Sequence, residues 1–316
     1  MKNVLLFCDP GIDDSIAIMY ALLHPDINLV GVVSGYGNVD KKQATNNVAY
    51  LMDLANQKGI PIIGGATRSC TGEAPIYYPE IHGEDGLGPI RPPDTIKGEL
   101  LNFSEVFKVI ERHSDVFVVD VGRNTSLAVA MILDNEFQKK VKGFYVMGGA
   151  FLVPGNVTEA AEANFYGDPI ASNFVMSEID NVYSVPLNVT NKAIVKHEHI
   201  LAIQDQSSSA LISILDEVYD YYYEAYKKLV PGIQGAPLHD VVSLSLLMNP
   251  GMGQFLTRRV SVQSIGAARG QSLANFRVGS EAPIEGEEDL TKANIYLSLD
   301  YDAFIKDFIK IMSKQS

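Results

Sequence analysis

The chain has 316 residues, of which 25 are Lys or Arg and 38 are Asp or Glu, giving a formal net charge of −13. This acidic balance argues against nucleic acid or an anionic membrane as a partner, because both need a basic surface. No run of about 18 apolar residues is present to span a membrane, and the N-terminal apolar run is too short for a signal peptide. Two cysteines cannot form a disulfide framework, so we expect a globular protein of the reducing cytoplasm.

Short apolar runs alternate with amphipathic stretches along the chain. The apolar runs are predicted strands, because near-continuous Val, Ile and Leu indicate burial on both faces of a parallel sheet. They span residues 3–8, 27–34, 60–63, 116–121, 143–147 and 182–186. Predicted helices lie between them at 13–23, 41–57, 103–112, 124–133 and 169–177. This alternation predicts an α/β fold with a mostly parallel central sheet flanked by helices.

The order changes after residue 187. Helices are expected at 197–204, 207–229 and 238–248, strands near 259–265 and 293–297, and a closing helix to about residue 313. No linker, repeat or low-complexity tract divides the chain, so residues 1–316 are expected to form a single domain.

Residues suited to chemistry follow directly after the predicted strands. In a parallel sheet, ligands bind beyond the carboxyl ends of the strands. Polar or glycine-rich segments stand at these places, namely 9–14, 35–38, 122–125, 147–149 and 188. This regular placement indicates an enzyme rather than a scaffold.

The first of these segments carries three carboxylates, those of Asp9, Asp13 and Asp14, around a Pro10-Gly11 turn. Acids at a helix N-terminus are explained by capping, since they face the positive end of the helix dipole. An acid on the preceding strand adds like-charge repulsion that capping does not relieve. Ca²⁺ or Mg²⁺ would relieve it, whereas no Cys/His ligand spacing suggests zinc. We therefore favour a metal site over capping.

Two further segments contribute polar groups. His239 and Asp240 precede an apolar helix, where an isolated pair is most simply a loop histidine and a helix cap. A fourth carboxylate beside a histidine would instead complete an oxygen-rich site, with a histidine that titrates near neutrality and protonates a leaving group. In segment 155–164, Asn156, Glu162 and Asn164 suit vicinal hydroxyls, although the segment alone is only a polar loop.

Taken together, these segments resemble the nucleoside hydrolase family, the inosine–uridine-preferring nucleoside N-ribohydrolases. The family's signature turn is Asp-x-Asp-Pro-Gly-x-Asp-Asp, and segment 9–14 matches all but its first position. Further matches follow in family order at 37–38, 82–88, 122–128, 147–149, 155–164 and 236–240. The resemblance covers roughly residues 1–250 and implies a Rossmann-like nucleoside hydrolase domain, which we expect to form a homo-oligomer, a dimer or tetramer.

The resemblance implies a calcium-dependent enzyme that converts a nucleoside and water into ribose and a free base. One Ca²⁺ would be held by Asp9, Asp14, Asp240 and the backbone carbonyl of Thr125. Asp9 would also be the general base toward the water at the metal, and His239 the leaving-group acid. The residues that would hold the ribose are Asp13, Asn38, Asn156, Glu162 and Asn164. His82 would lie in a mobile loop near the base.

The chain departs from the family pattern at three points. Phe7 stands where the family has its first Asp, so an acid behind the metal site is missing. Arg123 replaces a Pro, which places a cation near the metal loop, and Ser126 replaces an Asn. No Trp is present, so stacking on a base would come from Tyr or Phe. Tyr222 and Tyr226 are our choices for base contact, although a tyrosine stretch at helical spacing is more often helix packing.

Two alternatives stay open. One is a metal-dependent phosphohydrolase, disfavoured because, apart from Arg123, no Lys or Arg follows the apolar runs convincingly. The other is a non-catalytic, calcium-dependent nucleoside or ribose binder, which Phe7 and Arg123 would mark. Retention of both His239 and Asp240 favours the enzyme, which would act in nucleoside salvage on a base that the sequence does not identify.

Overall fold

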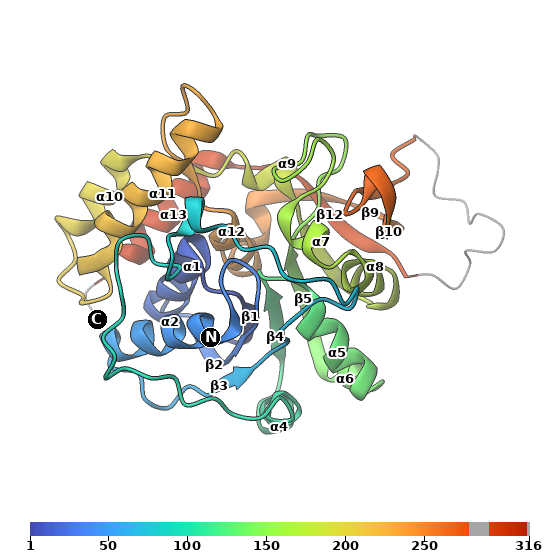
Figure 1. Ribbon diagram of the computed structural model, residues 1–316, viewed down its shortest axis with the longest axis horizontal. Coiled ribbons are helices and arrows are strands. Elements are labelled where there is room, and N and C mark those ends of the chain that lie inside the picture. Colours follow the sequence, from blue (N-terminus) through green and yellow to red (C-terminus); the bar gives the residue numbers. More distant parts are fainter. Residues whose placement is uncertain (278–290, 315–316) are drawn as a thin grey trace.

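The computed structural model describes residues 1–277 and 291–314. Its centre is a sheet of eight strands in the order β3-β2-β1-β4-β5-β6-β12-β9 (Figure 1). These strands are β1 (Lys2–Cys8), β2 (Ile27–Ser34), β3 (Ile62–Gly64), β4 (Val116–Asp120), β5 (Val141–Met147), β6 (Val182–Val185), β9 (Gly253–Arg258) and β12 (Ala293–Leu299). All neighbours are parallel except β9, which is antiparallel to β12. The predicted α/β fold with a mostly parallel sheet is confirmed.

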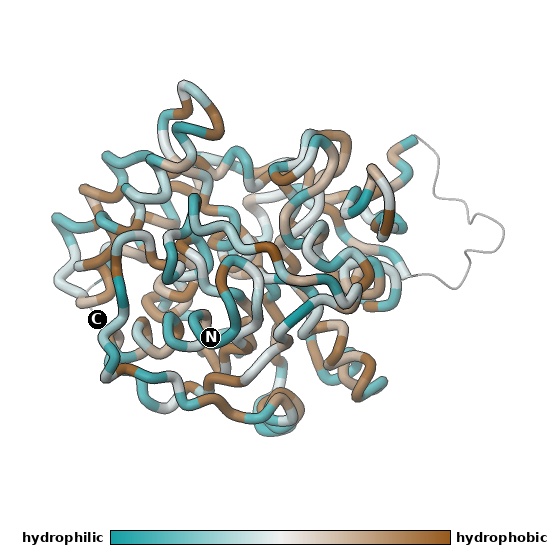
Figure 2. The backbone as a smooth tube through the Cα atoms, viewed as in Figure 1, coloured by the Kyte–Doolittle hydropathy of each residue, from teal (hydrophilic) through white to brown (hydrophobic). Residues whose placement is uncertain are grey.

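Helices cover both faces of the sheet (Figure 1). One face carries α1 (Ile12–Leu23), α2 (Lys41–Leu54), α10 (His197–Gln204), α11 (Leu215–Leu229), α12 (His239–Met248) and α13 (Tyr301–Met312). The other carries α4 (Glu105–Arg112), α5 (Thr125–Leu133), α6 (Phe137–Lys140) and α8 (Pro169–Glu178). The outer helices alternate hydrophobic and hydrophilic residues (Figure 2), as expected where one side packs on the sheet. None of the described helices is long and apolar enough to cross a membrane.

Strand β1 shows why the sheet reads as continuous apolar runs. Its side chains point to opposite faces in turn. Val4 and Leu6 join the hydrophobic cluster beneath α1 and α12, and Leu5 and Phe7 join the cluster beneath α5 and α8. All four are buried, so both faces of the strand demand apolar residues.

The sheet order places the loops that carry the polar segments at one edge. β1 lies between β2 and β4. The chain therefore adds β2 and β3 on one side of β1 and then crosses to add β4 and the following strands on the other side. Ligands bind at such a switch point, beyond the carboxyl ends of the strands. Three short helices lie in or near these loops, α3 (Pro79–His82), α7 (Ala163–Gly167) and α9 (Leu187–Thr190).

The C-terminal half differs from the prediction in three elements. The helix expected from residue 207 begins at Leu215, after a 3₁₀ turn at Ile212–Ile214, because the Ser207 and Ser209 groups form a local turn instead. The strand expected at 259–265 is only β10 (Val260–Val262), paired with β11 (Ser272–Ala274) outside the main sheet. The edge strand β9 was not predicted, because its side chains are mostly exposed and lack an apolar run.

Candidate functional site

A cavity of about 570 Å³ opens at the carboxyl edge of the sheet, where loops from both sides of β1 meet α11 and α12. Every residue predicted to bind substrate lines it, and so do His239 and Asp240. These predicted residues are Asp13, Asn38, His82, Asn156, Glu162, Asn164, Tyr222 and Tyr226. Residues as far apart in sequence as Asp13 and Asp240 therefore line the same cavity.

The floor of the cavity is acidic. One carboxylate oxygen from each of Asp13, Asp14 and Asp240 lies within 4.8 Å of the others, and all three side chains are buried. Asp13 and Asp14 come from the first turn of α1, and Asp240 from the first turn of α12. In these positions the carboxylates also face two positive helix ends. The capping interpretation thus describes part of the arrangement, but it does not explain why two helix starts converge.

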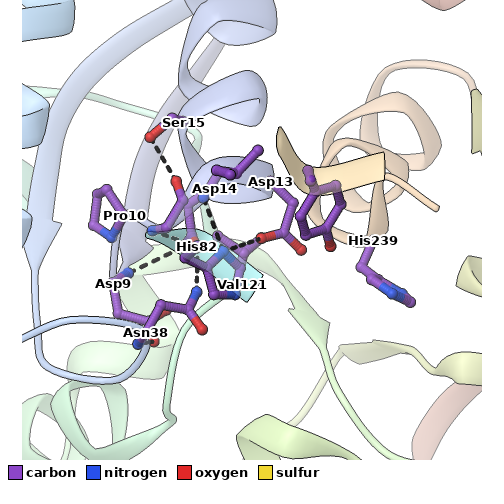
Figure 3. Close-up of polar contacts among 12 residues, drawn as sticks. Asp9, Pro10, Asp13, Asp14, Ser15, Asn38, His82, Val121 and His239 are labelled. Atoms are coloured by element: carbon purple, nitrogen blue, oxygen red, sulfur yellow. Dashed lines mark hydrogen bonds and ion pairs between the residues drawn. The ribbon is translucent and has the colours of Figure 1, made fainter. Parts of the chain in front are cut away.

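Asp9, the last member of the group, is held beside Asp14 (Figure 3). The backbone N–H of Asp9 donates to Asp14 Oδ1 at 3.0 Å. Asn38 links the two acids, since its backbone N–H donates to Asp9 Oδ2 at 2.8 Å and its side-chain amide donates to Asp14 Oδ2 at 2.8 Å. All three of these oxygens are therefore fixed in direction by neutral donors.

Two glycines complete the cage around Asp9. A Cβ at Gly37 would lie 1.5 Å from Asp9 Oδ2, and a Cβ at Gly122 would lie 2.7 Å from Asp9 Oδ1. Either side chain would displace the carboxylate, so both positions require glycine. The orientation of Asp9 is thus set by backbone packing from the loops after β2 and β4.

The acidic group fits a bound cation. Burial is the main cause that raises the pKa of Asp9, Asp13, Asp14 and Asp240, and the neighbouring carboxylates raise the pKa of Asp9, Asp13 and Asp240 further. For Asp13 the pKa rises to about 8. Among the described residues, Asp9 Oδ1 and Asp13 Oδ1 are buried without a hydrogen-bond partner. Buried acids crowded in this way need a positive charge, and oxygen ligands suit a hard divalent cation.

Thr125, whose carbonyl is the predicted metal ligand, does not line the cavity. Thr125 is the first residue of α5, so its carbonyl points along the helix and accepts from the next turn. Its hydroxyl donates to Asp168 Oδ2 at 2.6 Å and does not face the acids. Val121, at the end of β4, lines the cavity instead, and its carbonyl accepts a 2.9 Å hydrogen bond from Asn164 Nδ2.

A buried acid lies beside Phe7 on the neighbouring strand. Asp120 is the register partner of Phe7 across β1 and β4 and is buried. Its carboxylate accepts from the Gly122 N–H at 3.3 Å and from Asn124 Nδ2 at 3.0 Å. Asp120 therefore orders the turn that carries Val121. The sequence pattern did not indicate this neighbour, because Phe7 and Asp120 lie on strands that are far apart in the chain.

The loop after β5 supplies fixed polar groups on one wall. Glu162 caps α7 and accepts from the N–H groups of Gly149, Asn164 and Phe165, at 3.0, 2.7 and 3.1 Å. Burial raises its pKa, and these three donors oppose that rise. Asn156 Oδ1 accepts from Ala163 N–H at 3.0 Å. The loop that looked uninformative in sequence is thus rigidly connected to the start of α7.

The opposite wall carries histidines and tyrosines. His239 Nδ1 lies 2.8 Å from Thr190 Oγ1, and its Nε2 lies 2.9 Å from Tyr226 Oη. Burial lowers the pKa of His239 to about 4, so the expectation that it titrates near neutrality is wrong. Thr190 and Tyr226 bond a neutral imidazole, which has one donor and one acceptor. Figure 3 places His239 to one side of the acids.

His82 is fixed from α3 onto the start of α1. Its Nδ1 accepts from the Ile12 N–H at 3.0 Å, so the hydrogen of the neutral ring is on Nε2. Burial, with smaller contributions from His239 and Arg123, lowers the pKa of His82 to about 3. Its ring centre lies 5.7 Å from that of Tyr222. The tyrosine stretch of α11 therefore has two uses, because Tyr219 is fully buried and bonds Val195, whereas Tyr222 and Tyr226 reach the cavity.

Fold and site together are those of an α/β enzyme with an acidic, cation-binding type of centre. The family model described as inosine-uridine preferring nucleoside hydrolase matches residues 4–306. A probable uridine nucleosidase 2 of Arabidopsis thaliana is 30% identical over 96% of this chain and 95% of its own. A pyrimidine-specific ribonucleoside hydrolase RihA of Escherichia coli O8 (strain IAI1) is 33% identical over 86% and 88%.

Solved structures agree. A plant nucleoside hydrolase superposes with a TM-score of 0.89 at 27% identity, covering 99% of each chain. A purine-preferring ribonucleoside hydrolase from Gardnerella vaginalis shares the fold, with a TM-score of 0.88 at 24% identity over 99% and 98%. The chain therefore belongs to the inosine-uridine preferring nucleoside hydrolase family and is an N-ribohydrolase.

Proposed function

We propose that this enzyme hydrolyses the N-glycosidic bond of ribonucleosides in a calcium-dependent reaction that releases ribose and a free base, as part of nucleoside salvage. One observation carries the proposal. Four buried acids from two helix starts and a strand end converge beneath a cavity whose other groups are amides, hydroxyls and neutral histidines. We also propose that residues 1–316 form a single domain and that the enzyme is a cytoplasmic homo-oligomer.

Asp9, Asp14, Asp240 and the Val121 carbonyl would hold the ion. All are oxygen donors, which favours calcium over softer metals. When bound, calcium supplies positive charge that makes a coordinated water more acidic and fixes vicinal hydroxyls, although less strongly than zinc would. The unpartnered oxygen of Asp9 supports this assignment, because a buried carboxylate without a partner is costly unless a cation lies beside it.

Asp9 is the proposed general base. Its Oδ2 accepts from Asn38, whereas its Oδ1 has no partner among the described residues and is available to take a proton from water. Asp13, Asn38, Asn156, Glu162 and Asn164 would grip the ribose. C–N cleavage builds positive charge on the sugar, and the carboxylates of Asp9, Asp13 and Glu162 would stabilise that charge.

Departure of the base would use the other wall. His239 is the proposed acid; it would act as the imidazolium, which requires that its ring take up a second proton when substrate is bound, and that proton would reach the base from Nε2 by way of the Tyr226 hydroxyl. Tyr222 and His82 would pack against the base. The relatives named uridine nucleosidase and pyrimidine-specific ribonucleoside hydrolase support uridine as a substrate. Pyrimidine ribosides are thus the proposed preference.

The two alternatives are weaker. A phosphohydrolase would need cations around its substrate, but in the described part of the chain no Lys or Arg lines this cavity. A pure binder would not need a buried carboxylate oxygen left without a hydrogen-bond partner, as Asp9 Oδ1 is among the described residues.

The test is reducing-sugar release from uridine, cytidine, inosine and adenosine, with and without a calcium chelator. We expect chelator-sensitive ribose release, fastest with uridine or cytidine. An exposed acid, Asp26, offers the control variant Asp26→Asn, which changes charge as Asp9→Asn does but lies outside the cavity. Tight uridine binding with no release from any riboside would support the binder, and the absence of both would favour the phosphohydrolase.

A further inference from the structure

Arg123, the residue that departs from the family motif, lies behind the active site in an unusual state. Its side chain is only 6% exposed. Its Nη2 reaches the carbonyls of Gly37 and Ile76 at 3.3 and 3.4 Å, and its Nε has no hydrogen-bond partner among the described residues. A guanidinium carries five N–H donors, so these two long contacts and an interaction with the Tyr78 side chain leave donors unused, Nε among them. A buried cation in this condition is costly unless an anion pairs with it.

The absence of a side chain at Gly167 leaves space for the Arg123 guanidinium. A Cβ at Gly167 would lie 1.8 Å from Arg123 Nη1, so only glycine allows the guanidinium to pass. The rings of Tyr36 and Tyr78 both lie 5.9 Å from its central carbon, a distance suited to cation–π attraction. The neighbouring elements therefore hold Arg123 in place through the space left at Gly167 and through two aromatic rings.

Arg123 faces a second cavity, of about 200 Å³. Arg269 lines the opposite side, where its Nε donates to the Tyr166 carbonyl at 3.2 Å and its guanidinium pairs with Glu73. Tyr36, Tyr78 and Tyr166 also line this cavity. With two guanidinium groups against one carboxylate, the cavity has a net positive charge in a protein whose net charge is −13.

This second cavity adjoins the active site. Tyr78 lines both cavities. The charge of Arg123 also acts on Asp9 and Glu162, where it opposes the larger upward effect of burial on the pKa of each acid. A group bound beside Arg123 would therefore lie next to the sugar end of the proposed nucleoside site.

We propose that the cavity between Arg123 and Arg269 binds a phosphate group. Guanidinium forks match the geometry of phosphate oxygens. The phosphate would come either as inorganic phosphate or as the 5′-phosphate of a nucleotide whose ribose occupies the main cavity. The second source rests on the proposed function, and the first does not.

Calorimetric titration with inorganic phosphate and with uridine 5′-monophosphate tests this proposal. We expect one phosphate site per chain, with affinity about tenfold or more weaker in Arg123→Gln, since bonds to charged groups are the strong ones. Arg68→Gln is the matched control, because Arg68 is exposed on a nearby loop and its loss changes the net charge equally. Arg269→Gln tests the other wall should Arg123→Gln fail to fold.

The two ligands separate the sources. Uridine 5′-monophosphate that binds more tightly than uridine, with the gain lost in Arg123→Gln, identifies a nucleotide phosphate. Inorganic phosphate binding without such a gain identifies the free ion. Absence of binding by both, or equal affinities in Arg123→Gln and Arg68→Gln, overturns the proposal. Because binding is read without catalysis, an inactive enzyme that binds phosphate through Arg123 would refute the proposed function alone.

Discussion

The acidic floor and the tyrosine wall of the main cavity are built in different ways. Asp9, Asp13 and Asp14 come from one six-residue turn, and backbone atoms and glycines fix their positions. The wall around His239 is assembled from α3, α9, α11 and α12, and the side chains of His239, Thr190 and Tyr226 hold one another there. The rigid floor is suited to the bond cleavage that all ribosides share. The wall is suited to selecting the base, because a substitution there changes one side chain without moving the backbone.

The largest effect is expected at the floor. Replacing Asp9 by Asn keeps its shape but removes the general base, so kcat for uridine should fall on the order of 10³-fold. Initial rates of ribose release would measure the loss, with Asp26→Asn as the control. Activity of Asp9→Asn within a few fold of the wild type would remove Asp9 from its proposed role.

Gly37→Ala tests whether the cage around Asp9 matters. The new methyl group would displace Asp9 Oδ2, and a shift of about 1 Å can reduce a rate roughly 100-fold. The matched control is Gly59→Ala, since nothing lies within 4 Å of a Cβ built there. Rates and thermal unfolding should be measured for both variants. Equal activity in Gly37→Ala and Gly59→Ala would show that the Asp9 carboxylate can move without loss of activity, which would contradict the proposed role of the cage.

At the wall the expected effect is smaller and depends on the base. Tyr226→Phe removes the hydroxyl that bonds His239, so kcat should fall about tenfold and the uridine-to-inosine ratio should change. Tyr223→Phe is the control, because the Tyr223 hydroxyl bonds the Ile233 carbonyl. A uniform loss for every base, with the ratio unchanged, would place Tyr226 in the common reaction and not in base selection.

Asp120 should affect the metal more than the rate. Asp120→Asn weakens the support of the turn that carries Val121, so calcium affinity should drop roughly tenfold. Calcium titration of activity would reveal this, with saturating calcium restoring most of the rate. Asp115→Asn serves as the control, since Asp115 is exposed and paired with Lys142. Identical calcium dependence in both variants would assign Asp120 to folding only.

The floor could be predicted from sequence because its geometry is local. A buried strand, a Pro-Gly turn and a helix start already fix where three acids point, and the apolar runs predict the parallel sheet around them. The Thr125 carbonyl was harder to choose, because a carbonyl ligand depends on where β4 ends and α5 begins, and only four residues separate the two elements here. That boundary is the least certain feature of a pattern reading.

The wall could not be predicted to the same degree. The contacts of His239 with Thr190 and Tyr226 join residues 49 and 13 positions apart, and no local pattern announces them. The low pKa of His239 follows from burial, which only the packed structure reveals. Strand β9 was missed for a related reason, because its exposed side chains give no apolar signal and its place is set by pairing with β12.

The most direct test of the central claim is calcium add-back. The enzyme would be stripped of metal, and ribose release from uridine would be followed as calcium or magnesium is restored. We predict negligible release without metal and full recovery at one calcium per chain, with magnesium less effective because it demands a stricter geometry. Full activity in the metal-free enzyme would contradict the account of the acidic floor.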